Sequence, residues 1–206
     1  RPRLWLASLL HKNGHYRQAA DAAAAAVRLG PEDADAYLQQ AASMAAAGED
    51  AAALEVLREG SSDVRDPAAL YRQMGRIHLQ RAAAARTPAE RSERQSCALE
   101  AYRRALQHKP DDSAILFRLG RLHLERGEPQ QAAAYLDRLS ALPDLDEDLR
   151  RKLAVAYAEA GQAGKAVEML QALGDDDSPA DARVGLALSA LYRQLGNEAA
   201  ALNSLR

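Results

Sequence analysis

Glycines recur along the chain at a nearly fixed interval. Gly14 and Gly48 are 34 residues apart, Gly127 and Gly161 are also 34 apart, and Gly196 follows Gly161 by 35. A period of this length is the signature of a repeat architecture, in which small similar units stack on one another. The chain is therefore expected to form an array of repeats rather than a globule around one central core.

Each repeat carries the pattern of two short helices. An alanine stands five residues after each of these glycines, and a second amphipathic stretch, such as Leu116 to His123, lies upstream of each. Alanine and leucine supply 77 of the 206 residues, against six valines, two isoleucines and one threonine. Because alanine and leucine favour helices and β-branched residues favour strands, an all-α fold is predicted and a β-rich one is excluded.

Two copies show the repeat most completely. Their characteristic positions are Tyr71, Met74, Gly75, His78, Ala98, Tyr102, Ala105 and Pro110 in one copy, and Leu116, Leu119, Gly120, His123, Ala132, Leu136 and Leu139 in the other. This arrangement resembles the tetratricopeptide repeat, in which small residues let two helices approach closely and larger ones fill the space to the next helix. The resemblance, to a bacterial protein of this family, implies a right-handed α-solenoid of about six antiparallel helix pairs.

The repeats account for the whole chain as a single array. They are assigned to residues 1–33, 34–67, 68–112, 113–146, 147–181 and 182–206, which leaves no stretch for a catalytic domain. The ends depart from the family pattern: Arg3 and Ala23 stand where aromatic residues are preferred, and Gly60 replaces an alanine. Because the chain begins at Arg1 and its last helical pattern ends without a cap, we expect it to be a segment of a longer protein.

The third repeat is longer than its neighbours by 11 residues, and the extra length lies near residues 82–93. Arg81 to Arg86 is a strong helix-forming stretch, and Thr87, Pro88 and Glu90 have the residue types of a helix N-cap and first turn. This pattern predicts two elongated helices that turn at Thr87. A disordered loop is the alternative, because insertions in loops cost little.

Charge and hydropathy exclude two classes of partner. The chain has 27 Lys and Arg against 29 Asp and Glu, so it lacks the positive surplus that drives sequence-independent binding to nucleic acid. No apolar run approaches the roughly 18 residues that a membrane-spanning helix needs. We therefore expect neither nucleic-acid binding nor membrane insertion, while a cytoplasmic or a periplasmic location stays open.

The sequence has no motif for catalysis or for a cofactor. It contains no Gly-rich phosphate loop, no dinucleotide fingerprint, no paired-cysteine metal spacing and no His-Glu-x-x-His. Cys97 adjoins a packing position and is interpreted as a structural thiol. His78 and His123 occupy the same slot of adjacent repeats and are interpreted as packing imidazoles rather than metal ligands. Most aromatic residues, Trp5 among them, are also assigned to packing, so we expect no enzyme, no cofactor and no metal site.

The resemblance implies a concave groove lined by the first helix of each pair. In the family, the groove-facing positions lie three before and one after the small packing residue of that helix. Carried over to this chain, they are Leu4 and Ser8, Leu38 and Ala42, Arg72 and Arg76, Phe117 and Arg121, Arg151 and Val155, and Leu186 and Ala190. The middle of the expected groove is therefore basic and its ends are apolar. The main candidates for peptide contacts are Leu38, Arg72, Arg76, Phe117, Arg121, Arg151 and Val155.

The arginines of the expected groove suggest an acidic ligand. Arginine binds carboxylates through two parallel hydrogen bonds, so an acidic peptide or a C-terminal carboxylate would suit a wall that holds four of them. The alternative is that they form a solvated face balanced by nearby acids such as Glu125 and Glu159. The Lys/Asn clamp of the chaperone-binding members is absent, because Leu4, Ser8, Gln39, Ala69 and Gln73 occupy the matching positions.

Two functions remain compatible with the sequence. One is a scaffold that binds a peptide or protein partner in the concave groove. The other is a regulatory or substrate-recruiting region of a larger enzyme, or of a polysaccharide or protein export system. The partner's identity and the oligomeric state are not specified by any of these residues.

Overall fold

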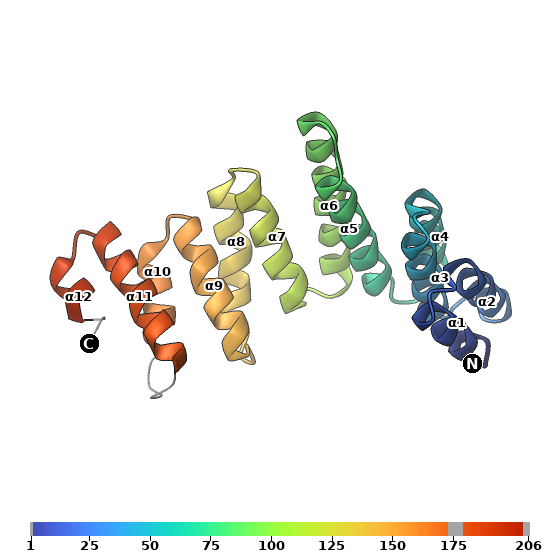
Figure 1. The fold of residues 1–206 in the computed structure, drawn as a ribbon, viewed down its shortest axis with the longest axis horizontal. Helices are drawn as coiled ribbons and strands as arrows, with labels where there is room; N and C mark the ends of the chain where they lie inside the picture. The colour runs from blue at the N-terminus through green and yellow to red at the C-terminus, as the bar shows by residue number, and fades with distance from the viewer. Residues whose placement is uncertain (1, 173–178, 204–206) are drawn as a thin grey trace. The chain divides into compact units, whose positions relative to one another are not determined.

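The computed structural model of the chain describes residues 2–172 and 179–203, without the side chains of residues 179–185 and 187. Over these residues the chain forms twelve α-helices and no strand (Figure 1), which confirms the all-α prediction. It divides into two compact units, Arg1–Pro110 and Asp111–Arg206. No helix within the described ranges is long and apolar enough to cross a membrane.

The N-terminal unit is a stack of three helix pairs. Its helices are α1 (Pro2–Lys12), α2 (Tyr16–Leu29), α3 (Ala34–Ala46), α4 (Asp50–Asp63), α5 (Ala68–Ala83) and α6 (Pro88–His108). Each helix packs against the next, and α5 contacts α3 as well as α4. The first helices of the pairs also contact one another in order, α1 with α3 and α3 with α5. Buried residues such as Tyr37, Leu57, Leu70 and Ile77 fill the space between neighbouring pairs.

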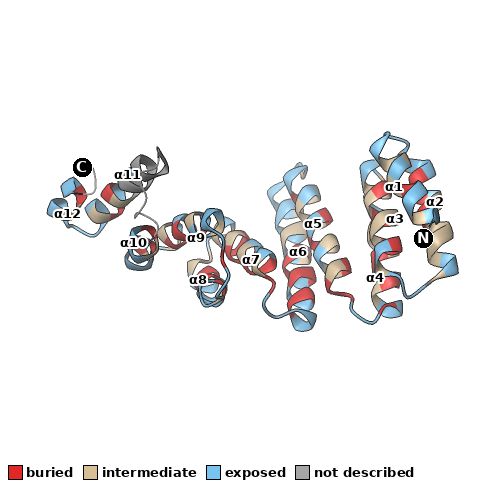
Figure 2. Ribbon diagram, turned by 90° about the horizontal axis from the view of Figure 1, so that it is seen from below, coloured by how far each residue is buried: buried red, intermediate tan, exposed pale blue. Residues whose placement is uncertain are grey.

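The C-terminal unit has the same construction. Its helices are α7 (Ser113–Glu125), α8 (Pro129–Ser140), α9 (Glu147–Glu159), α10 (Ala163–Gln171), α11 (Pro179–Gln194) and α12 (Glu198–Asn203). The largest buried side chains, Leu119, Leu136, Leu153 and Tyr157, lie on the inward faces of α7 to α9, where Figure 2 shows the buried positions in red. Each pair buries its apolar residues only against its neighbours, as expected for a solenoid.

The repeating glycines lie in the turns inside the helix pairs. Gly48, between α3 and α4, has φ +81°, and Gly127, between α7 and α8, has φ +71°. This left-handed conformation is costly for residues that carry a Cβ, so the tight turn requires glycine at one fixed position in the pairs that use it. The 34-residue period of the sequence is therefore the spacing of these turns.

Glycines inside helices have a different role, which is close packing. A Cβ on Gly75 would lie 2.6 Å from the Tyr102 ring, and a Cβ on Gly120 would lie 2.6 Å from Leu136. The same holds for Gly60, where a Cβ would lie 2.6 Å from the Tyr37 ring. Gly60 departs from the family's alanine at this position, and the structure gives the departure a packing reason. The glycine makes room for an aromatic side chain that a neighbouring helix supplies.

The pair α5 and α6 is the longest, at 16 and 21 residues, and its connection contains no glycine. Helix α5 continues to Ala83, and α6 begins at Pro88 immediately after its N-cap, Thr87. The Thr87 hydroxyl accepts a hydrogen bond from the Glu90 amide at 3.2 Å, and the Glu90 carboxylate accepts one from the Arg86 amide at 3.3 Å. Two backbone amides at the start of α6 are thus satisfied by local side chains. The division into six repeats and a single array remains a prediction.

Candidate peptide-binding groove

A groove of about 910 Å³ runs along the first helices of the three N-terminal pairs. Its lining residues are Leu4, Trp5 and Ser8 of α1, Asp33, Asp35, Leu38, Gln39 and Ala42 at α3, and Ala69, Arg72 and Gln73 of α5. Five of the six positions that the sequence analysis placed in the groove of this unit are among them: Leu4, Ser8, Leu38, Ala42 and Arg72. Arg76 is exposed on α5 but does not line this groove.

The spacing of the lining residues follows from helix geometry. Leu4 and Ser8, and likewise Leu38 and Ala42, are four residues apart and therefore share one face of a helix. Ala7, the packing residue of α1, is fully buried behind the face that carries Leu4 and Ser8, and its small side chain lets α1 lie close to its neighbours. Because α1, α3 and α5 form one row, their exposed faces join into a continuous surface.

A buried polar contact behind the groove holds α1 to α3. Ser43 is fully buried; its hydroxyl lies 3.0 Å from Nδ1 of His11 and donates to the Gln39 carbonyl at 2.8 Å. The Gln39 side chain donates to the same hydroxyl at 3.3 Å. Gln39 is therefore held in place on the groove floor by a side chain that does not itself reach the groove.

The lining residues that sequence reasoning missed include Trp5, Asp33 and Asp35. Trp5 was assigned to packing, but 68% of it is exposed and it lines the groove, so that assignment was wrong. An aromatic residue in an amphipathic helix has the same sequence signal whether a neighbouring helix covers it or not. Asp33 was also missed as a groove residue; it caps α3 by accepting a hydrogen bond from the Asp35 amide at 3.0 Å.

In the C-terminal unit, the expected groove residues lie on α7, on α9 and, for the exposed Leu186 and Ala190, on α11. Phe117 is half-buried, and Val155 is 51% exposed. Arg121 of α7 forms an ion pair with Glu159 of α9, and Arg151 forms one with Glu147 one turn earlier in α9. At Arg121 and Arg151, the arginines are therefore balanced by nearby acids, as the alternative interpretation of the sequence expected. The convergence of four arginines on one wall remains a prediction, because Arg72 and Arg76 belong to the other unit.

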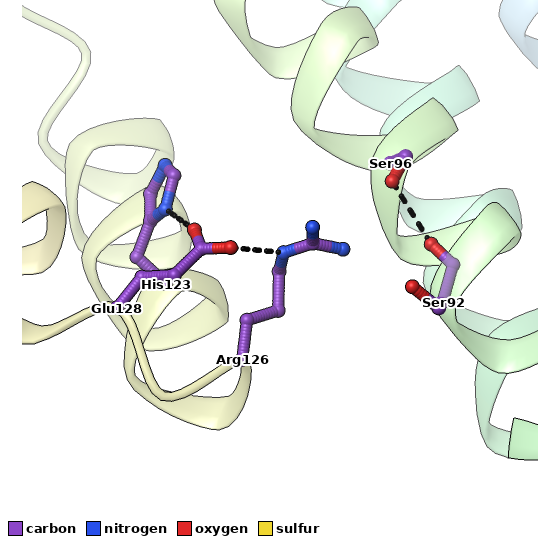
Figure 3. A network of polar contacts seen from close by, with 5 residues as sticks. All are labelled: Ser92, Ser96, His123, Arg126 and Glu128. Atoms are coloured by element: carbon purple, nitrogen blue, oxygen red, sulfur yellow. Dashed lines mark hydrogen bonds and ion pairs between the residues drawn. The ribbon is translucent and has the colours of Figure 1, made fainter.

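The two histidines considered for metal binding differ in their surroundings. The His123 side chain is only 2% exposed, is stacked on Tyr135 with ring centres 5.4 Å apart, and lies with Nδ1 2.6 Å from a Glu128 oxygen. Arg126 donates to the other oxygen of Glu128 at 3.0 Å (Figure 3). The hydrogen bonds from His123 and Arg126 lower the pKa of Glu128. This network joins the end of α7 to the start of α8 and leaves the Glu128 carboxylate fully occupied.

His78 is half-buried, and burial together with the charges of Arg81 and Arg94 lowers its pKa. Cys97 is half-buried and free. Over the described part of the chain, no three His, Cys, Asp or Glu side chains are grouped so that they could hold a metal ion. The nearly fully buried, stacked imidazole of His123 has the surroundings of a packing side chain, whereas the half-buried His78 keeps an Nδ1 atom without a hydrogen-bond partner.

Comparison with known proteins identifies the class. Two family models, both described as tetratricopeptide repeat, match residues 6–63 and 97–144. The chain belongs to the tetratricopeptide repeat family. Its fold is that of α-helical solenoids that generally act as non-catalytic interaction modules and bind protein or peptide partners.

Several solved structures share this fold at low sequence identity. YrrB, a tetratricopeptide repeat protein with an unusual peptide-binding site, is 21% identical, with 90% of this chain and 89% of that chain covered and a TM-score of 0.67. PilF of Pseudomonas aeruginosa is 18% identical, with coverages of 98% and 87% and a TM-score of 0.64. PilW, a type IV pilus biogenesis factor, is 22% identical, with coverages of 98% and 88% and a TM-score of 0.60. No curated protein sequence matches the chain.

Proposed function

We propose that the groove of α1, α3 and α5 binds an extended segment of a protein partner. The observation that carries this proposal is that side chains from three successive helix pairs line one continuous groove of about 910 Å³. An extended peptide advances about 3.3 Å per residue, so a short segment suffices to contact all three helices. YrrB is described as having a peptide-binding site, and the proposal gives this chain a site of the same general kind.

Apolar contacts supply the main favourable term. Leu4, Trp5 and Leu38 line the groove, and Trp5 is largely exposed. Covering apolar surface is worth roughly 25 cal/mol per Å², and a tryptophan that becomes covered is the residue type most often dominant at interfaces. Gln39 and Gln73 each carry both a donor and an acceptor, which suits hydrogen bonds to a peptide backbone. The ligand is therefore a segment with bulky apolar side chains.

The charge of the ligand is mixed rather than purely acidic. Arg72 lines the groove and suits a carboxylate, but Asp33 and Asp35 line it as well and favour a basic side chain. In the C-terminal unit, Arg121 and Arg151 already have carboxylate partners. An acidic segment thus has support from Arg72 alone within this groove. Phe117 and Val155 are proposed as apolar contacts for a partner that extends along α7 and α9.

The second function considered, recruitment for a larger enzyme or an export system, rests on the sequence alone. PilW is described as a pilus biogenesis factor, but at 22% identity the likeness shows a shared fold. Binding of a partner segment in the groove would serve either role. The groove is therefore the feature to test first.

The test is a selection of displayed random peptides against the full chain, followed by titration of the best labelled peptide. Leu38→Asp should weaken binding by at least about tenfold, which corresponds to 1.4 kcal/mol, because it places a charge among apolar contacts. Leu29→Asp is the matched control: Leu29 is 74% exposed on α2, outside the groove, and its variant should bind like the wild type. Equal affinities for the wild type and Leu38→Asp, with both folded by circular dichroism, would disprove the groove as the binding site.

A further inference from the structure

Many basic side chains of the chain lie beside a carboxylate. In the N-terminal unit, Arg17 pairs with Glu49, Arg58 with Glu55, and Arg104 with Glu100. The α5/α6 hairpin concentrates arginines that lack such a partner. In the described part of the chain, no ion pair or hydrogen bond to a carboxylate is formed by the side chains of Arg76, in the middle of α5, or of Arg81, Arg86, Arg91 and Arg94, nearer the turn.

Three of these arginines belong to a cluster that includes a histidine. His78 and Arg81 are three residues apart on α5, and Arg91 and Arg94 are three apart on α6, so each pair shares a helix face. Helices α5 and α6 pack along each other, and the charges of Arg81 on α5 and Arg94 on α6 both contribute, after burial, to lowering the pKa of His78. We call His78, Arg81, Arg91 and Arg94 the hairpin cluster.

The hairpin cluster has unused hydrogen-bonding capacity. Nδ1 of His78 and Nε of Arg94 are buried and have no hydrogen-bond partner. Arg91 on α6 and Arg86 at the turn are exposed, and neither side chain has a carboxylate partner among the described residues. A ligand that brings carboxylate oxygens to this surface can therefore form charge-assisted hydrogen bonds with their guanidinium groups.

The local charge is opposite in sign to that of the whole chain. Residues 76–96 contain five arginines and two glutamates, a formal net charge of +3, whereas the complete chain carries −2. A concentration of like charges that nearby acids compensate only in part is electrostatically unfavourable in isolation. It is the arrangement expected at a surface that meets an anionic partner.

We propose that the hairpin cluster, with Arg86 at the turn, docks an Asp- and Glu-rich segment of a protein partner, at a site separate from the groove. Guanidinium groups bind carboxylates through paired hydrogen bonds, and four of them within one hairpin end match a short acidic run. Residues 76–96 contain no Phe, Tyr or Trp on which nucleic-acid bases could stack. They also present no large exposed apolar side chain to enter a lipid surface.

The experiment is a fluorescence anisotropy titration of the full chain with a labelled peptide of alternating Asp and Glu. The triple variant Arg81→Ala/Arg91→Ala/Arg94→Ala should weaken binding by at least about tenfold at low salt, because three carboxylate contacts are lost. The matched control is Arg17→Ala/Arg58→Ala/Arg65→Ala, which removes the same charge from arginines that already have partners. This control should bind within about twofold of the wild type.

Several outcomes would overturn the proposal. Equal weakening in the two triple variants would show that only the overall charge matters. Tighter binding of labelled single-stranded DNA or of phosphatidylserine vesicles than of the acidic peptide would assign the surface to a different partner. If loss of the half-buried Arg94 impairs folding, Arg86→Ala/Arg91→Ala at exposed positions provides the same comparison. Leu38→Asp should leave acidic-peptide binding unchanged, which separates this site from the groove.

Discussion

Arg121 on α7 donates a hydrogen bond to the carboxylate of Glu159 on α9, 38 residues further along the chain. The contact joins two successive helix pairs and occupies a guanidinium that the sequence assigns to ligand binding. Both side chains are partly exposed, at 36% and 46%, so the pair should contribute little to stability. A double-mutant cycle with Arg121→Ala and Glu159→Ala should give a coupling free energy of about 0–1 kcal/mol in urea unfolding.

The same pair makes a prediction about binding. Because Glu159 screens Arg121, Glu159→Gln should strengthen the affinity of the chain for an acidic peptide that contacts α7 and α9, and Arg121→Gln should not weaken it by more than about twofold. Titrations at about 0.1 M and about 1 M salt, where the Debye lengths are about 10 Å and about 3 Å, test this directly. A large loss of affinity in Arg121→Gln would restore Arg121 as a ligand contact.

Substitution of the close-packed small residues should destabilise the fold. Gly75→Leu, Gly120→Leu and Ala166→Leu each force a large side chain into a filled space, and each should lower the free energy of unfolding by roughly 1–3 kcal/mol. Gly164 in α10 is the control, because nothing lies within 4 Å of a Cβ built there. Gly164→Ala should raise stability by up to about 1 kcal/mol through helix propensity. Unchanged urea midpoints for all three leucine variants would contradict the described packing.

The turn glycines should be sensitive to alanine. Gly48→Ala places a Cβ on a residue with φ +81° and should cost about 1–2 kcal/mol, although no neighbouring atom obstructs the side chain. Gly30, at the end of α2, has φ −154° and serves as the comparison. Gly30→Ala should leave the thermal midpoint unchanged or raise it. Equal losses in the two variants would show that side-chain contacts, rather than backbone conformation, decide the effect.

Acid should weaken the C-terminal unit through Glu128. Hydrogen bonds from His123 and Arg126 lower the pKa of Glu128 below its ordinary value of 4.5. The native state therefore binds the proton less readily than the unfolded state, so this stabilisation is complete above pH 4.5 and is lost as the pH falls through the native pKa. Glu128→Gln should flatten the fall in stability over that range, as measured by urea unfolding at a series of pH values. An unchanged slope would show that the network does not distinguish the two protonation states.

The fold was predictable because its constraints are local. A tight turn with positive φ accepts glycine almost alone, and a close helix contact accepts only small residues, so positions such as Gly48 and Gly75 carry structural information in the sequence itself. The register of those residues also places Leu38 and Arg72 beside the groove. The sequence alone does not explain Gly60, because the reason lies on another helix, where Tyr37 fills the space that an alanine side chain would need.

The ligand chemistry was less predictable, because it depends on which side chains meet across helices. The pairing of Arg151 with Glu147 could be anticipated from their spacing of four residues along one helix. The pairing of Arg121 with Glu159 could not, since it requires the relative placement of α7 and α9. The exposure of Trp5 likewise depends on what covers α1, which periodicity does not reveal.

The connection between α5 and α6 lacks the left-handed glycine that fixes where the turn falls in the other pairs. A turn that depends on that glycine fixes where the first helix ends and the second begins. A turn that depends on the Thr87 cap can instead lie further along, with both helices longer or shorter by the same amount. Matched turns of helix can therefore be added to or removed from the end of this hairpin without disturbing the stacked core beneath it. The distance by which its arginines project from the stacked helices can thus change while the rest of the array stays the same.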